Sequence, residues 1–114
     1  METQELLEQT KELAVLIKQS KLYQEYLSAL EVVKKDEELY RRINEYRRIR
    51  MMLQMNDVNQ TLEESGRIRW EYDSVLRNEQ ALAFFTAERR LIRLLRDINH
   101  CVMDGIELDI DFLQ

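Results

Sequence analysis

The sequence contains no proline, and its 114 residues include only two glycines and one cysteine. The absence of proline and the scarcity of glycine exclude the turn-rich composition of most sandwiches and barrels, and favour long helices. A single cysteine excludes an intrachain disulfide and is typical of a reducing compartment. No apolar run is long enough to cross a bilayer, so no membrane insertion is expected. Glu2, Glu5 and Glu8 stand where a signal peptide would be apolar or basic, and we therefore predict a cytoplasmic protein.

Charge is unevenly distributed along the chain. The formal net charge is −5, which does not favour a general attraction to nucleic acid or to membranes. All lysines precede residue 36 and all arginines follow residue 40, so that residues 41–100 are weakly basic between two acidic ends. A basic patch in the middle of the chain is therefore a local feature that the total charge conceals.

The longest periodic stretch runs over residues 79–103. Phe84, Leu91 and Ile98 recur every seventh residue, and Ala87, Leu94 and Cys101 repeat the same period beside them. On a helix these positions form one apolar stripe, whereas the arginines of this stretch fall on the opposite face. Such a helix is about 37 Å long and outruns the other helices of a domain this small. Part of its stripe is therefore expected to meet a second subunit.

The remaining chain has the same helical periodicity, with polar residues at the expected helix starts. Ser20, Asp36 and Asn78 are predicted N-caps, and Thr61 begins a T-x-x-E capping box. A loop is expected at about 56–60, and Gly105 is the predicted stop of the last helix. The expected helices cover residues 2–18, 21–35, 37–55, 62–77 and 79–103. We predict one all-α domain over residues 1–114, an antiparallel bundle of about five helices with a long C-terminal helix and an acidic tail at 104–114.

Two segments resemble a known family. They are SKLYQEYLSALEVVKKDEELYRRINEYRR at residues 20–48 and NEQALAFFTAERRLIRLLRDINHCV at residues 78–102. In their order and spacing they are similar to the YlbF/YmcA family of small helical bacterial proteins, which includes YheA-like members. The resemblance spans roughly residues 5–103 and depends mainly on helical core positions such as Tyr23, Phe84 and Asp97.

The resemblance implies an all-α fold that self-associates, and a regulatory role without catalysis. Members of that family act as non-enzymatic partners in a cytoplasmic complex. The complex influences RNA processing by a membrane-anchored endoribonuclease, with effects on competence, biofilm formation and sporulation. The partners implied are a second copy or a paralogue. Some members bind an iron–sulfur cluster through several cysteines, but this chain has only Cys101, so we predict no cofactor.

The sequence offers no catalytic constellation. His100 and Cys101 are neighbours on a helix and point about 100° apart, whereas metal-binding pairs use i, i+3 or i, i+4 spacing. Cys101 falls on the apolar stripe and is interpreted as a buried, hydrophobic thiol. The paired acids such as Glu37 and Glu38 lie in first helical turns, where they interact favourably with the helix dipole. We therefore predict that the protein is not an enzyme.

The arginines have two interpretations. The first is a solvated helix surface with i, i+4 partners, such as Arg41 with Glu45 and Arg93 with Asp97. The second is a basic ridge that binds RNA phosphates or an acidic protein surface. The candidate partner-binding arginines are Arg41, Arg48, Arg89, Arg93 and Arg96.

The other candidate partner-binding residues are apolar. Met51, Met52 and Met55 cluster at a helix end, where flexible thioethers make an adaptable contact surface. Trp70, the only tryptophan, lies off the apolar face formed by Ile68 and its neighbours. It is predicted to belong either to an interface or to the periphery of the core.

Overall fold

A computed structural model describes residues 2–55, 62–106, 109 and 111–113 of the chain. The described residues form six α-helices and one 3-10 turn, without a strand, which confirms the predicted all-α class. The helices are α1 (Glu2–Gln19), α2 (Lys21–Lys34), α3 (Glu37–Met55), α4 (Leu62–Glu71), α5 (Asp73–Leu76) and α6 (Glu79–Asp104), and the turn η1 is Asp111–Leu113.

The helix starts follow the predicted caps. A side-chain oxygen at each cap position accepts a hydrogen bond from the backbone N–H three residues further on, which satisfies a donor that the helix leaves free. These bonds run from Tyr23 N to Ser20 Oγ (3.2 Å), from Leu39 N to Asp36 Oδ1 (3.1 Å) and from Ala81 N to Asn78 Oδ1 (3.0 Å). The predicted cap at Thr61 and the loop at 56–60 lie outside the described residues.

The single helix predicted at 62–77 is divided at Tyr72. This residue leaves the helical conformation, with φ −103° and ψ 20°, and separates α4 from α5. The guanidinium of Arg42 stacks 4.4 Å from the Tyr72 ring and donates a hydrogen bond of 2.8 Å to the carbonyl of Glu71. A carbonyl exposed by the break is thus satisfied by a distant side chain, which the local apolar pattern cannot reveal.

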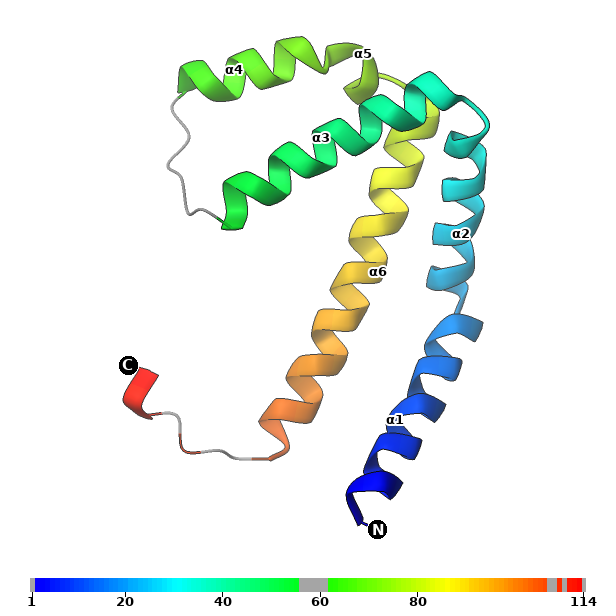
Figure 1. Cartoon of the computed structure of the whole chain (residues 1–114), viewed down its shortest axis with the longest axis vertical. Coiled ribbons are helices and arrows are strands. Elements are labelled where there is room, and N and C mark those ends of the chain that lie inside the picture. Colours follow the sequence, from blue (N-terminus) through cyan, green and yellow to red (C-terminus); the bar gives the residue numbers. More distant parts are fainter. Residues whose placement is uncertain (1, 56–61, 107–108, 110, 114) are drawn as a thin grey trace.

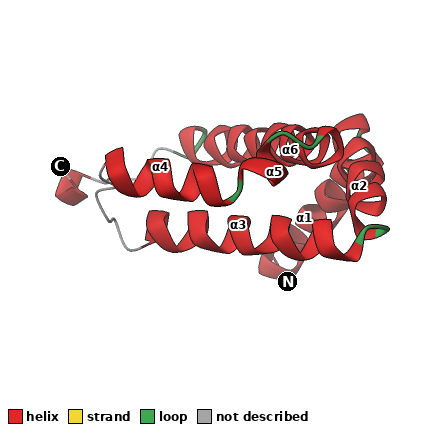
Figure 2. Cartoon of the chain, turned by 90° about the horizontal axis from the view of Figure 1, so that it is seen from above, coloured by secondary structure: helices red, strands yellow, loops and turns green. Residues whose placement is uncertain are grey.

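The helices are arranged as two long legs with an arm at one end (Figure 1). Helices α1 and α2 follow one another along one leg, and α6 runs antiparallel beside α2. Helices α3 and α4 form the arm, which projects sideways from the closed end of the legs, and α5 leads from the arm into α6. Seen from above, α3 lies in a different layer from α6 (Figure 2).

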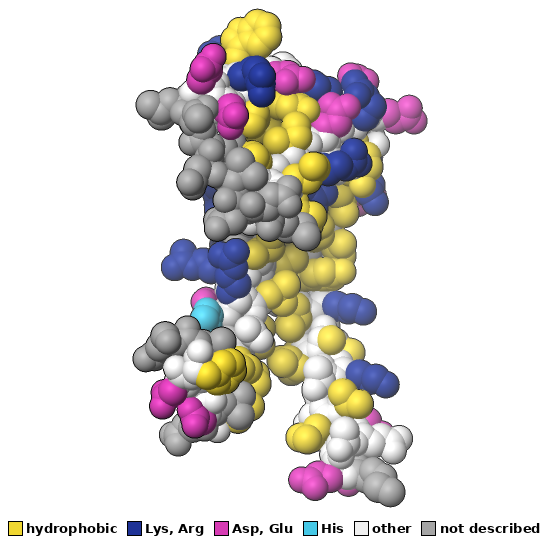
Figure 3. All heavy atoms as spheres, turned by 60° about the vertical axis from the view of Figure 1, so that its left-hand side comes forward, with side chains coloured by type: hydrophobic (Ala, Val, Ile, Leu, Met, Phe, Trp, Pro, Cys, Tyr) yellow, Lys and Arg dark blue, Asp and Glu magenta, His cyan; other side chains and the backbone are white. Residues whose placement is uncertain are grey.

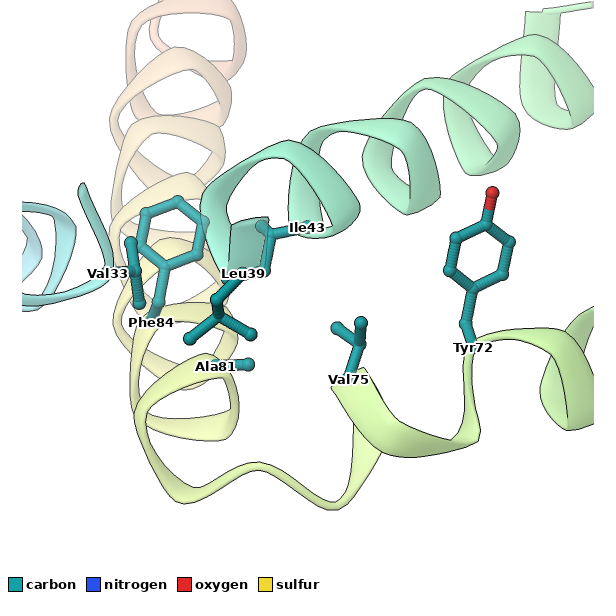
Figure 4. Close-up of a cluster of buried hydrophobic side chains, with 7 residues drawn as sticks. All are labelled: Val33, Leu39, Ile43, Tyr72, Val75, Ala81 and Phe84. Carbon is teal, nitrogen blue, oxygen red and sulfur yellow. The ribbon is translucent and has the colours of Figure 1, made fainter. Parts of the chain in front are cut away.

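The core lies where the arm meets α2 and α6 (Figure 4). Phe84 and Ile43 are fully buried there, together with Val33 and Val75. The Phe84 ring lies 5.7 Å from the ring of Tyr26 on α2, and Tyr46 on α3 lies 5.7 Å from Phe85. One aromatic cluster therefore joins α2, α3 and α6, and its contacts hold the arm against the legs.

The molecule is much more extended than a compact chain of its length. Its radius of gyration is 18.3 Å, and its extents are 52 × 38 × 19 Å. A compact domain of this length has a radius of gyration of about 13 Å. The excess arises because the ends of the two legs lie beyond the core. Within the described residues, no helix combines the length and the apolar character needed to cross a membrane.

Candidate protein-interaction surface

Helix α1 buries none of its side chains. Its helical spacing places Leu6, Leu13 and Ile17 on one face, where Leu6 and Leu13 are 63% and 36% exposed and Ile17 is half-buried. In proteins most helical stability comes from packing an apolar face, and an isolated helix of this length is marginal in water. The described part of the chain therefore supplies little cover for the apolar face of its first helix.

The apolar stripe of α6 is covered along its first half only. Phe84, Ala87 and Leu91 are buried, whereas Leu95 and Val102 are 43% and 50% exposed. The cause is length, because α2 has 14 residues and α6 has 26, so α2 covers only the first half of its neighbour. Figure 3 shows hydrophobic side chains that continue as a column down the molecule between its two legs.

The prediction of a buried Cys101 is wrong. The thiol is exposed, because it lies on the second half of the α6 stripe, which no other part of the described chain covers. Within the described residues, no group of three His, Cys, Asp or Glu side chains is arranged to hold a metal ion.

We group the uncovered apolar residues of the two legs under one name, the α1–α6 apolar face. It comprises Leu6, Leu13, Leu16, Ile17, Leu94, Leu95, Ile98 and Val102. The accessible surface of the chain is 9857 Å². A compact monomer of this mass exposes about 6,700 Å², and a stable interface buries about 800 Å² on each partner. The accessible surface in excess of that of a compact monomer is therefore larger than the area that one ordinary interface buries on each partner.

The sequence identified the members of this surface but not their exposure. Each stripe was visible as a helical period, and a stripe predicts burial. Whether α1 folds back over α6 depends on the turn at Ser20. There α1 ends with a hydrogen bond of 3.0 Å from Ser20 N to the carbonyl of Ile17, and α2 starts at Lys21 without a reversal. The helical period alone carries no information about that direction.

The first arginines of α3 are neutralised within the chain. Arg41 forms ion pairs with Glu38 and Glu45, which confirms the predicted partner Glu45. The hydrogen bonds from Arg41 lower the pKa of Glu38, and the same pairing raises the pKa of Arg41. Both side chains are mostly exposed, so the pairing organises the surface more than it stabilises the fold. Arg41 is thus a poor candidate for contact with a partner.

The remaining candidate arginines are exposed. Arg48 on α3 and Arg89, Arg93 and Arg96 on α6 form no ion pair in the described part of the chain. The predicted pair between Arg93 and Asp97 does not form. Arg48 faces away from Ile43, and the three α6 arginines face away from Phe84. Ile43 and Phe84 belong to the same core, so neither arginine set faces that core, and the two sets stand on helices that lie in different layers (Figure 2).

The candidate methionines and the tryptophan lie at the surface of the arm. Met51 and Met52 are 61% and 55% exposed, and the side chain of Met55 lies outside the described part. Trp70 is 82% exposed, which excludes the alternative of a place at the edge of the core. An exposed tryptophan is typical of residues that dominate binding energies at interfaces.

The site therefore consists of surfaces and contains no buried charged group among the described residues. A family model described as "Control of competence regulator ComK, YlbF/YmcA" matches residues 6–107. A search of curated proteins and a search of solved structures each find no match. The matched range contains the whole of α2 to α6 and most of α1.

Proposed function

Because the chain belongs to the YlbF/YmcA family, whose description is control of competence regulator ComK, we propose that it is a non-enzymatic regulatory adaptor. It works by holding other proteins on its helical surfaces. The family supports a regulatory role in competence. More specifically, we propose that it acts in a cytoplasmic complex that modulates RNA processing by an endoribonuclease. Through RNA processing the complex would affect competence, biofilm formation and sporulation.

The observation that carries the proposal is the α1–α6 apolar face. A chain that exposes apolar side chains such as Leu6, Leu95 and Val102 gains free energy by burying them, about 25 cal/mol for each Å² covered. The legs are long and amphipathic, so the natural cover is another pair of helices that packs along them. The partner is a second copy of this chain or a paralogue with the same two legs.

A second candidate function is direct RNA binding. The observation that favours it is the row formed by Arg89, Arg93 and Arg96, whose guanidinium groups have no carboxylate partner in the described part of the chain. Free guanidinium groups bind phosphates in bidentate fashion, and the affinity falls steeply with salt. The net charge of −5 weighs against general RNA affinity, so the adaptor remains the better-supported function.

An affinity pull-down of the tagged full chain from its native cytoplasm separates the two functions. The extract is divided, and one half is treated with nuclease before capture. The adaptor proposal predicts that the same proteins are recovered in stoichiometric amounts from both halves. Two results together would contradict the adaptor proposal and favour direct RNA binding. The captured proteins would disappear after nuclease treatment, and the triple change Arg89→Glu, Arg93→Glu and Arg96→Glu would also abolish their capture.

A further inference from the structure

A groove lies between α3 and α4 in the arm, remote from the α1–α6 apolar face. Its volume is about 300 Å³, which accommodates one or two large side chains. The lining residues are Tyr46, Ile49, Arg50, Leu53 and Gln54 of α3, Ser65, Ile68 and Arg69 of α4, and Leu76 of α5. Ile49, Leu53, Ile68 and Leu76 are half-buried, so they offer accessible aliphatic surface among the polar side chains of the lining.

The rim of the groove is positively charged. Arg50 and Arg69 stand on the two helices that border it, and neither forms an ion pair in the described part of the chain. Arg50 lies over the Tyr46 ring, 5.8 Å from its centre, so its charged head is held at the mouth of the groove. Residues 46–55 of α3 contain three arginines and no acid, in contrast to the first half of the helix, where Glu38 and Glu45 neutralise Arg41.

The exposed Trp70 lies next to Arg69 in the sequence, on the outer surface of the same helix. Accessible aliphatic side chains and two guanidinium groups without an ion pair in the described part of the chain are features that anchor an amphipathic helix in a groove. Nucleic acid would use the arginines but gain little from the aliphatic side chains, so the combination favours a peptide.

We propose that the groove between α3 and α4 binds an acidic amphipathic helix of a partner protein. Apolar side chains of that helix enter the groove, and its carboxylates pair with Arg50 and Arg69. The inference rests on the proposed adaptor function and names the kind of partner that the arm receives. The arm and the α1–α6 apolar face are separate, so one chain holds this partner and a second subunit at the same time.

The test uses a fluorescently labelled helical peptide with leucines at i, i+3, i+4 and i+7 and glutamates at its other positions, together with a twin that carries lysine in place of glutamate. Fluorescence anisotropy with the full chain measures both affinities. The wild type is expected to bind the acidic peptide and not its basic twin. The double change Arg50→Glu and Arg69→Glu is expected to weaken binding of the acidic peptide by at least about tenfold, because it places like charges opposite each other.

Arg67→Glu is the matched control. Arg67 lies on α4 two residues before Arg69 and does not line the groove, so its reversal should change the affinity by no more than about twofold. The Arg50→Glu and Arg69→Glu protein should gain affinity for the basic twin. Such a gain shows that the variant is folded and that charges at the rim of the groove select the peptide.

Three results overturn the proposal. They are no binding of the acidic peptide by the wild type, an equal loss in the Arg67→Glu control, and binding of single-stranded RNA at the same rim arginines. The last result would assign the groove to nucleic acid. None of these three results changes which proteins the pull-down recovers in stoichiometric amounts. Conversely, a pull-down that recovers no protein would leave peptide binding by the purified chain unchanged.

Discussion

At the scale of single residues, the α3 surface shows how pairing removes charge from a helix. Arg41 donates hydrogen bonds from Nη2 to Glu38 Oε1 at 2.5 Å and from Nε to Oε2 at 3.2 Å. Such a bidentate contact favours the ionised carboxylate, so the pKa of Glu38 lies below its ordinary value. The arginines that lack such partners, Arg48 and Arg50, lie further along the same helix.

Removing Arg41 should therefore return the pKa of the Glu38 carboxyl group toward its ordinary value. In Arg41→Gln the pKa of Glu38, followed by NMR of its side-chain carboxyl, is expected to rise toward the ordinary value, because the main hydrogen bonds and the nearest positive charge are lost. In the wild type the contact favours the folded state above the ordinary glutamate pKa. This contribution is lost as the pH falls through the lowered pKa.

Arg48→Gln is the control for that titration, because Arg48 is an exposed arginine of the same helix without an ion-pair partner in the described part of the chain. Its loss should leave the titration of Glu38 unchanged. Equal titration curves for Glu38 in the wild type and in Arg41→Gln would disprove the assigned cause.

At the scale of helices, the start of α6 is fixed by one side chain. Asn78 is half-buried, has φ −74° and ψ 127°, and accepts a hydrogen bond from Ala81 N at 3.0 Å. Ala81 itself is fully buried in the core, so the cap also places the first core residue of the longest helix.

Replacing the cap should cost stability without changing the fold. Asn78→Ala is expected to lower the free energy of unfolding by about 1 kcal/mol, because the N–H of Ala81 loses its acceptor. Asn78→Asp keeps an acceptor beside a helix N-terminus and should stay much closer to the wild type. Urea denaturation at one fixed protein concentration measures both changes. An Asn78→Ala protein as stable as the wild type would show that the cap contributes nothing.

Helix boundaries were predictable from the sequence because caps act over three or four residues. Ser20, Asp36 and Asn78 each start a helix where the local chemistry indicates. The break at Tyr72 was not predictable, since Arg42 lies far away in the sequence and satisfies the carbonyl of Glu71. The groove with Arg50 and Arg69 was missed for the same reason, because it exists only where α3 and α4 face each other.

At the scale of the whole molecule, the apolar pattern predicted which residues seek burial but not what buries them. Phe84 and Leu95 belong to one stripe, and only Phe84 is covered. The difference is set by the length of α2 and by the direction in which α1 leads into α2, which the helical period does not determine. The resulting chain has a well-packed closed end from which two legs project (Figure 1), and apolar side chains are exposed on both legs.

We expect these legs to be covered by a second copy of this chain. Leu6 and Leu95 are exposed on the two legs, so an aspartate at either position costs the isolated chain little but places a charge within a covered interface. Val15 offers a matched control, because it is 51% exposed on the same helix as Leu6 and faces about 180° away from it.

The most direct measurement is the mass of the purified full chain in solution, determined by light scattering at micromolar concentration. The expected mass is a multiple of 13.9 kDa for the wild type and for Val15→Asp, and that of a single chain, 13.9 kDa, for the double change Leu6→Asp and Leu95→Asp. A wild-type mass of 13.9 kDa, or an assembly that persists unchanged in the double variant, would contradict the claim that the α1–α6 apolar face joins one chain to another.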